Sequence, residues 1–203
     1  MVATLVAACG TTPATPGVSP PDASLGSAPS SPASATANPI GPPSGSPAAS
    51  APGVAVDPTL LSRVPAAIAG IPLTYDPVTT ATVAADPTLG HEASGLAMAI
   101  AVAPASSTST DLAIVSVIRL RDASASEAWF RAYRDSYDAA SCATAGGVSG
   151  NAQATMHDRT VFIGSCAGGA FTYHVWLPDG PLIVSATSVG PLRLGEKVME
   201  SIP

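Results

Sequence analysis

The histidines and serines are the first residues to consider for chemistry, because general bases and nucleophiles are often drawn from these types. The chain has three histidines, His91, His157 and His174, and none of them belongs to an HExxH or HxH metal motif. Neither a GxSxG nucleophile elbow nor an SxxK motif is present. We therefore expect no metal site, no cofactor and no catalytic residue that a motif would identify.

Two of the histidines and one aspartate still leave a catalytic interpretation open. His157 and Asp158 fall at a predicted turn, and His174 lies in a strand-like run. If folding brought two of these groups within hydrogen-bond distance in a cleft, they could serve as acid and base in a cell-envelope hydrolase. The competing interpretation is an exposed turn beside a partly buried histidine. The sequence favours this second, non-catalytic interpretation.

A cysteine follows a short apolar run at the amino end of the chain. Residues 5–9 read LVAAC, a branched aliphatic residue and small residues ahead of Cys9. This pattern resembles the bacterial lipobox, which implies that the Cys9 thiol carries a lipid and that residues 1–8 are part of a signal peptide. No Lys or Arg precedes the apolar run, so we expect Met1 to be an internal start. The alternative is an ordinary cysteine in a disordered tail.

The lipobox resemblance implies an extracytoplasmic, oxidising location, and this bears on the other two cysteines. Cys142 and Cys166 then form one disulfide. A metal pair or a reactive thiol is the alternative, but neither cysteine has another Cys or a His within three positions, as a zinc site would favour.

Composition divides the chain into a linker and a domain. Residues 10–55 are rich in Pro, Ala, Ser and Gly and contain one charged residue, Asp22, and no aromatic residue. Such a segment has too little apolar surface to offset the entropy of ordering. We therefore predict a lipid-bearing, disordered linker over 9–55 and a single domain over 56–203. The formal charge of −6, with scattered arginines and one lysine, argues against a nucleic-acid partner.

Within the domain, the apolar and polar patterns predict an ordered series of elements. A helix is predicted within residues 56–69. It starts at Asp57 and Pro58, and Pro65 shortens it. Residues 75–89 are predicted to be irregular or to form one short helix. The continuous apolar runs 96–103 and 112–120 predict a hairpin of buried strands. Glycines and a Pro-Asp-Gly turn then divide residues 152–187 into a four-strand meander, and a helix ends the chain.

The most regular pattern is a helix that follows a capping box at Ser124 and Glu127. Its aromatic residues recur at helical spacing on one side. Core packing against the sheet is the simpler interpretation of that side. If a pocket exists, we expect it where this helix meets the sheet, lined by Trp129, Tyr133, Tyr173 and Trp176.

These elements predict an α+β fold with an antiparallel sheet of about six strands, helices packed on it, and one disulfide. In element order the domain resembles the Mog1/PsbP-like domains of small lipoproteins, a resemblance of topology that implies no activity. We therefore expect a lipoprotein anchored to the cell membrane by its N-terminal lipid, outside the cytoplasm. Its domain would serve a non-catalytic binding or accessory role, with a small apolar ligand or an envelope protein as partner. The sequence does not define the oligomeric state.

Overall fold

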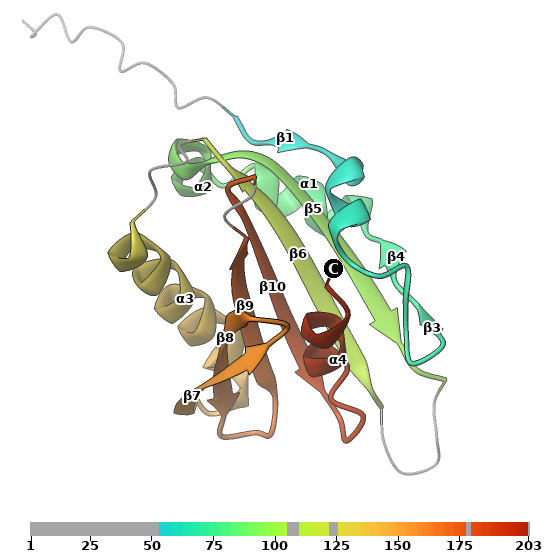
Figure 1. The fold of residues 1–203 in the computed structure, drawn as a ribbon. Helices are drawn as coiled ribbons and strands as arrows, with labels where there is room; N and C mark the ends of the chain where they lie inside the picture. Colours follow the sequence, from blue (N-terminus) through green and yellow to red (C-terminus); the bar gives the residue numbers. More distant parts are fainter. Residues whose placement is uncertain (1–52, 105–109, 122–125, 178–179, 203) are drawn as a thin grey trace, which may run out of the picture. The chain divides into compact units, whose positions relative to one another are not determined.

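The structure is a computed structural model that describes residues 53–104, 110–121, 126–177 and 180–202. The predicted signal segment, Cys9 and the linker up to residue 52 lie outside these ranges. The described chain forms an α+β domain, as predicted. Its sheet is mixed, and helices lie on both faces of it (Figure 1).

Six long strands make up most of the sheet. They are β5 (Ala93–Val102), β6 (Leu112–Leu120), β7 (Val148–Met156), β8 (Arg159–Cys166), β9 (Phe171–Leu177) and β10 (Leu182–Val189). Their order in the sheet is β5-β6-β10-β9-β8-β7, and each neighbouring pair is antiparallel. The predicted hairpin and meander are therefore confirmed, and the last strand of the meander lies beside β6. This order places β10 and β9 in the middle of the six strands.

Two short strands at the β5 edge make the sheet mixed rather than purely antiparallel. β1 (Ala55–Val56) pairs with β5 in parallel, and β4 (Thr74–Tyr75) pairs with it in the antiparallel sense. β1 begins one residue before the predicted start of the domain, and Val54 beside it is buried. A separate two-stranded hairpin consists of β2 (Ala67–Ile68) and β3 (Ile71–Pro72).

Helices cover both faces of the sheet. One face packs against η1 (Pro58–Arg63) and α4 (Leu194–Ser201), and the other against α1 (Pro77–Ala84), α2 (Pro87–Glu92) and α3 (Glu127–Cys142), which continues into η2 (Ala143–Ala145). β5 and β6 therefore bury side chains on both faces, which explains their continuous apolar sequences.

Three local predictions need correction. Residues 75–89 contain α1 and the first half of α2, because Asp76 and Asp86 each cap a helix that begins with proline. The helix predicted over 56–69 is a short 3₁₀ turn that ends before Pro65. The N-cap of α3 is Ser126, whose side chain accepts a hydrogen bond from the Trp129 amide, and Ser124 of the predicted capping box lies outside the described residues.

Candidate functional site

The candidate site lies between α3 and the sheet, and α3 supplies much of it. This helix places Trp129, Tyr133 and Tyr137 at i, i+4 and i+8, so their rings follow one another along one side. The Trp129 and Tyr133 rings stack with their centroids 5.7 Å apart. Phe130 and Asp138 lie on a neighbouring stripe and are buried against the strands. The helix thus presents both aromatic rings and the carboxylate of Asp138 to the sheet.

Below α3, the strand register places polar side chains in one row. His174 on β9 pairs with Ser185 on β10, which pairs with Ser116 on β6, which pairs with Met98 on β5. Because residues paired across a sheet point to the same face, the first three form a polar row in an otherwise apolar layer. Each of these three residues is at least 97% buried.

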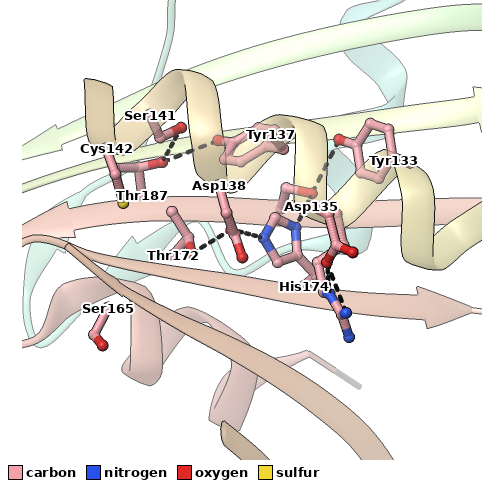
Figure 2. Close-up of polar contacts among 12 residues, drawn as sticks. Tyr133, Asp135, Tyr137, Asp138, Ser141, Cys142, Ser165, Thr172, His174 and Thr187 are labelled. Atoms are coloured by element: carbon pink, nitrogen blue, oxygen red, sulfur yellow. Dashed lines mark hydrogen bonds and ion pairs between the residues drawn. The ribbon is translucent and has the colours of Figure 1, made fainter. Parts of the chain in front are cut away.

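Asp138 connects α3 to this row from above. Its Oδ1 accepts a hydrogen bond from the Thr172 hydroxyl and lies 2.8 Å from Nε2 of His174 (Figure 2). His174 is completely buried, and Asp138 is 2% exposed. Because a carboxylate only accepts hydrogen bonds, Nε2 carries the hydrogen in this contact. A helix residue and two residues of one strand therefore share one buried hydrogen-bonded cluster.

Ser185 extends the cluster toward the aromatic side of α3. Its Oγ lies 2.9 Å from Nδ1 of His174 and 3.1 Å from the Tyr133 hydroxyl oxygen. In the neutral form of His174, Nδ1 accepts from Ser185, and Ser185 in turn accepts from Tyr133. Asp138, His174 and Ser185 thus have the residue types of a hydrolase triad. Ser185 is fully buried, however, and both its neighbours use its Oγ, so the arrangement joins α3 to the sheet.

A cavity of about 490 Å³ opens beside this cluster, within the size range of sites that hold small molecules. It lies between α1, α2, α3 and the strands β5 and β6. Its apolar lining consists of Val83, Leu89, Leu96, Met98, Ile118 and Ala132, together with the rings of α3. A molecule in this space would contact mainly hydrocarbon and aromatic surface.

Hydroxyl groups gather on one part of the cavity wall. Ser116 and the two tyrosines Tyr133 and Tyr137 all line it. Burial raises the pKa of both phenols above the ordinary value, although the neighbouring serine and threonine hydroxyls oppose this shift. Both tyrosines are therefore uncharged and carry their hydrogens at neutral pH. The Tyr137 oxygen accepts a hydrogen bond from Thr187 (Figure 2).

The charged groups of the wall are acidic. Asp86, the N-cap of α2, and Glu92 line the cavity. Hydrogen bonds from the side chain and backbone of Thr88 hold the pKa of Asp86 below its usual range, so this carboxylate is ionised at neutral pH. Among the described lining residues there is no Lys, Arg or His.

The four residues predicted to line a pocket do not come together. Trp129 and Tyr133 line the cavity just described. Trp176 lines a second hollow of about 910 Å³ between α3 and strands β7 to β9, where arginines of α3 are also found. Tyr173 is buried on the opposite face of the sheet, in the core beneath α4. Alternate residues of β9 point to opposite faces of the sheet, which separates Tyr173 from Trp176. The four residues were predicted to line one pocket, but the structure divides them among the cavity, the second hollow and the core beneath α4.

The residues of the hydrolase interpretation are also apart. His157 and Asp158 form the turn between β7 and β8, both with positive φ, and Asp158 borders the second hollow. His174 is enclosed beneath α3, where its side chain contacts Asp138, Ser185 and the two tyrosines. Within the described residues, no hydrogen bond links His174 to the turn.

Sequence reasoning missed Asp138, Ser185 and Ser116 as site residues. It placed Tyr137 on the aromatic side of the helix but did not name it among the four pocket residues. The available signal was weak. A serine interrupts the apolar run in each of the strands β6 and β10, and Asp138 directly follows Tyr137 in the helix. Only the pairing of β6 with β10 brings the two serines to adjacent positions.

The predicted disulfide is present and lies at the end of the site. Cys142, the last residue of α3, is bonded to Cys166, the last residue of β8. No cluster of His, Cys, Asp and Glu in the described part of the chain could hold a metal ion. None of the described helices has the length and apolar character required to cross a bilayer.

Comparisons with protein-family models, with curated proteins and with solved structures find no match to this chain. The site is therefore interpreted from its own geometry.

Proposed function

We propose that this protein is a lipid-anchored, extracytoplasmic lipoprotein whose domain binds a small, mainly apolar molecule in the cavity between α2, α3, β5 and β6. The observation that carries the binding role is the cavity itself, which is apolar over most of its wall and has hydroxyl groups on one part of it. Sites for small molecules commonly combine such a lining with a few placed polar groups.

The anchored location is supported by two features that are far apart in the sequence. The LVAAC segment supplies the cysteine to which a lipid would be attached, at Cys9. The disulfide between Cys142 and Cys166 is of the kind that persists in oxidising compartments. Together they support a domain that lies outside the cytoplasm, and the linker over 9–55 would tether it to the membrane.

The non-catalytic character is supported by the state of the Ser185 hydroxyl. A nucleophile must reach its substrate, but this hydroxyl is fully buried and hydrogen-bonded to His174 and Tyr133. Tyr133 lines the cavity, whereas Ser185 does not. A molecule in the cavity would therefore meet a tyrosine hydroxyl rather than an activated serine.

Binding of butylbenzene to the 203-residue chain tests the proposal, with Trp129 as a fluorescent reporter in the cavity wall. Every protein compared by fluorescence, here and below, also carries Trp176→Phe, so that the tryptophan of the second hollow does not contribute. We expect saturable quenching in the wild-type chain and its loss in Ala132→Phe, because the added ring occupies the space beside Trp129. Ala139→Phe is the matched control, since this exposed residue of α3 is outside the cavity lining. Equal binding by the wild type and Ala132→Phe would place the ligand elsewhere and contradict the proposal.

A further inference from the structure

Among the described residues that line the cavity, Ser116 has the one side-chain polar atom that is buried without a hydrogen-bond partner. Its oxygen is buried and makes no hydrogen bond of ordinary geometry, although it lies close enough to Tyr133 and Tyr137 to affect both phenols. Buried hydroxyls normally have a hydrogen-bond partner in the protein, because burial removes their hydrogen bonds to water and leaving these unreplaced costs free energy. An unsatisfied hydroxyl that lines a cavity is therefore a place where a ligand atom can supply the missing bond.

The neighbouring tyrosine has a hydrogen-bonding capacity of the same kind. Thr187 donates to the Tyr137 oxygen, so the hydrogen of that phenol is not used in this contact. Tyr133, in contrast, donates its hydrogen to Ser185 in the hydrogen-bond pattern described above. Ser116 can both donate and accept, and Tyr137 has a hydrogen to donate. Together they can hold one oxygen atom that accepts hydrogen bonds.

The charges of the wall define what kind of oxygen it is. Asp86 and Glu92 repel an anion, and the described lining residues provide no cation to neutralise one. A carboxylate or phosphate would lose its water without gaining a counter-charge. A hydroxyl or carbonyl oxygen has no such cost.

We propose that the cavity selects an uncharged amphiphile, an apolar molecule with one hydroxyl or carbonyl oxygen that is bound by Ser116 and Tyr137. This inference rests on the proposed binding function and adds the chemical class of the ligand. The apolar body of the molecule would lie against Met98, Ile118 and Trp129. Its oxygen would meet the polar row of the sheet at Ser116, the row residue on β6.

Three probes with the same apolar body test the proposal: butylbenzene, 4-phenyl-1-butanol and 4-phenylbutanoate. Their dissociation constants are measured with the 203-residue chain at neutral pH by quenching of Trp129 fluorescence. In Ser116→Ala we expect 4-phenyl-1-butanol to bind about five- to tenfold more weakly, the range of one net hydrogen bond. Butylbenzene should bind to this variant as well as to the wild type, or better, because an unsatisfied hydroxyl has been removed. The carboxylate should bind the wild type at least about tenfold more weakly than the alcohol.

Two further variants separate this role from a general effect on the fold. Tyr137→Phe should weaken binding of the alcohol selectively, as Ser116→Ala does. Ser201→Ala removes an exposed hydroxyl of α4, outside the cavity lining, and should leave all three probes unchanged. If Ser116→Ala and Tyr137→Phe affect the alcohol and the hydrocarbon equally, or if the carboxylate binds as tightly as the alcohol, the inference is wrong and the binding function stands. If none of the probes binds to the wild type, both proposals fail.

Discussion

Asp138 is on a helix, but its hydrogen-bond partners Thr172 and His174 are both on β9. The oxygen Oδ1 receives both bonds, and Oδ2 is buried with no partner among the described residues. Removing the carboxylate would leave two buried polar groups without their acceptor, and such losses are among the larger effects of single substitutions. The stability of the α3 face therefore depends strongly on this one side chain.

We expect Asp138→Ala to lower the free energy of unfolding by about 3 kcal/mol, because two buried groups lose their acceptor and each such loss costs about 1–3 kcal/mol. Urea unfolding followed by circular dichroism provides the measurement. Asp135→Ala, three residues earlier in the same helix, is the matched control, because Asp135 is exposed and Arg134 is its one ion-pair partner among the described residues. Its effect should stay below about 0.5 kcal/mol. Equal effects of the two substitutions would contradict the role given to Asp138.

At the level of elements, the start of each helix before β5 depends on an aspartate. The Asp76 carboxylate accepts from the amide of Thr79 at 3.0 Å and from its hydroxyl, and Asp86 makes the same two contacts with Thr88. These bonds hold the pKa of both carboxyl groups below the ordinary value of 3.8. α1 and α2 are short, so the caps are a large part of what defines them.

The caps predict how stability changes in acid. A carboxyl group whose pKa is lowered by folding stabilises the folded state above its unfolded pKa and loses this contribution as the pH falls through the folded pKa. We therefore expect the unfolding temperature to decrease below about pH 4. The double variant Asp76→Asn, Asp86→Asn should show a shallower decrease in thermal melts, because asparagine caps a helix without titrating. Parallel curves for the two proteins would show that other groups control the acid response.

The accuracy of the sequence predictions depended on how local each signal was. The aromatic spacing of α3 and the apolar runs of β5 and β6 involve neighbours in the chain, and these elements were correctly placed. The hydrogen bonds of Asp138 join residues more than thirty positions apart, and they exist only because β9 and β10 return beneath α3. No local pattern could have predicted this contact. The pair of cysteines was an exception, because a covalent bond needs no register to be inferred.

Pocket residues were harder to predict for a related reason. An aromatic side chain on an inward face has the same sequence signature whether it fills the core or borders a cavity. Tyr173 and Tyr133 both occupy inward positions, yet Tyr173 packs beneath α4 and Tyr133 lines the open space. The difference arises from the packing of α1 and α2 at the other side of the cavity, which sequence analysis predicted as irregular or one short helix.

For the whole molecule, the central question is whether Cys9 holds the protein at a membrane. If the thiol carries the lipid, Cys9→Ser should move the protein from the membrane fraction to the soluble fraction of cells that produce it with its own upstream signal, because stable anchoring requires acyl chains. Fractionation followed by immunoblotting measures the change. Thr11→Ser, a change just outside the LVAAC segment, is the control and should remain in the membrane fraction. Unchanged partitioning of Cys9→Ser would refute lipid attachment at this residue.

The position of the disulfide has a mechanical consequence for the cavity. Cys142 fastens the carboxyl end of α3 to β8, and Asp138 and Tyr137 hold the adjoining turn to β9 and β10. The first half of the helix, with Trp129 and Ala132, lines the cavity and is attached to the sheet by noncovalent contacts, among them the buried Phe130 ring and the hydrogen bond between Tyr133 and Ser185. The helix is therefore held by a covalent bond at its carboxyl end and by noncovalent contacts alone in its amino-terminal half. A bulkier ligand would therefore rotate α3 about its disulfide-bonded end, and the largest displacement would occur near Trp129. The core on the opposite face of the sheet, beneath α4, would keep its packing.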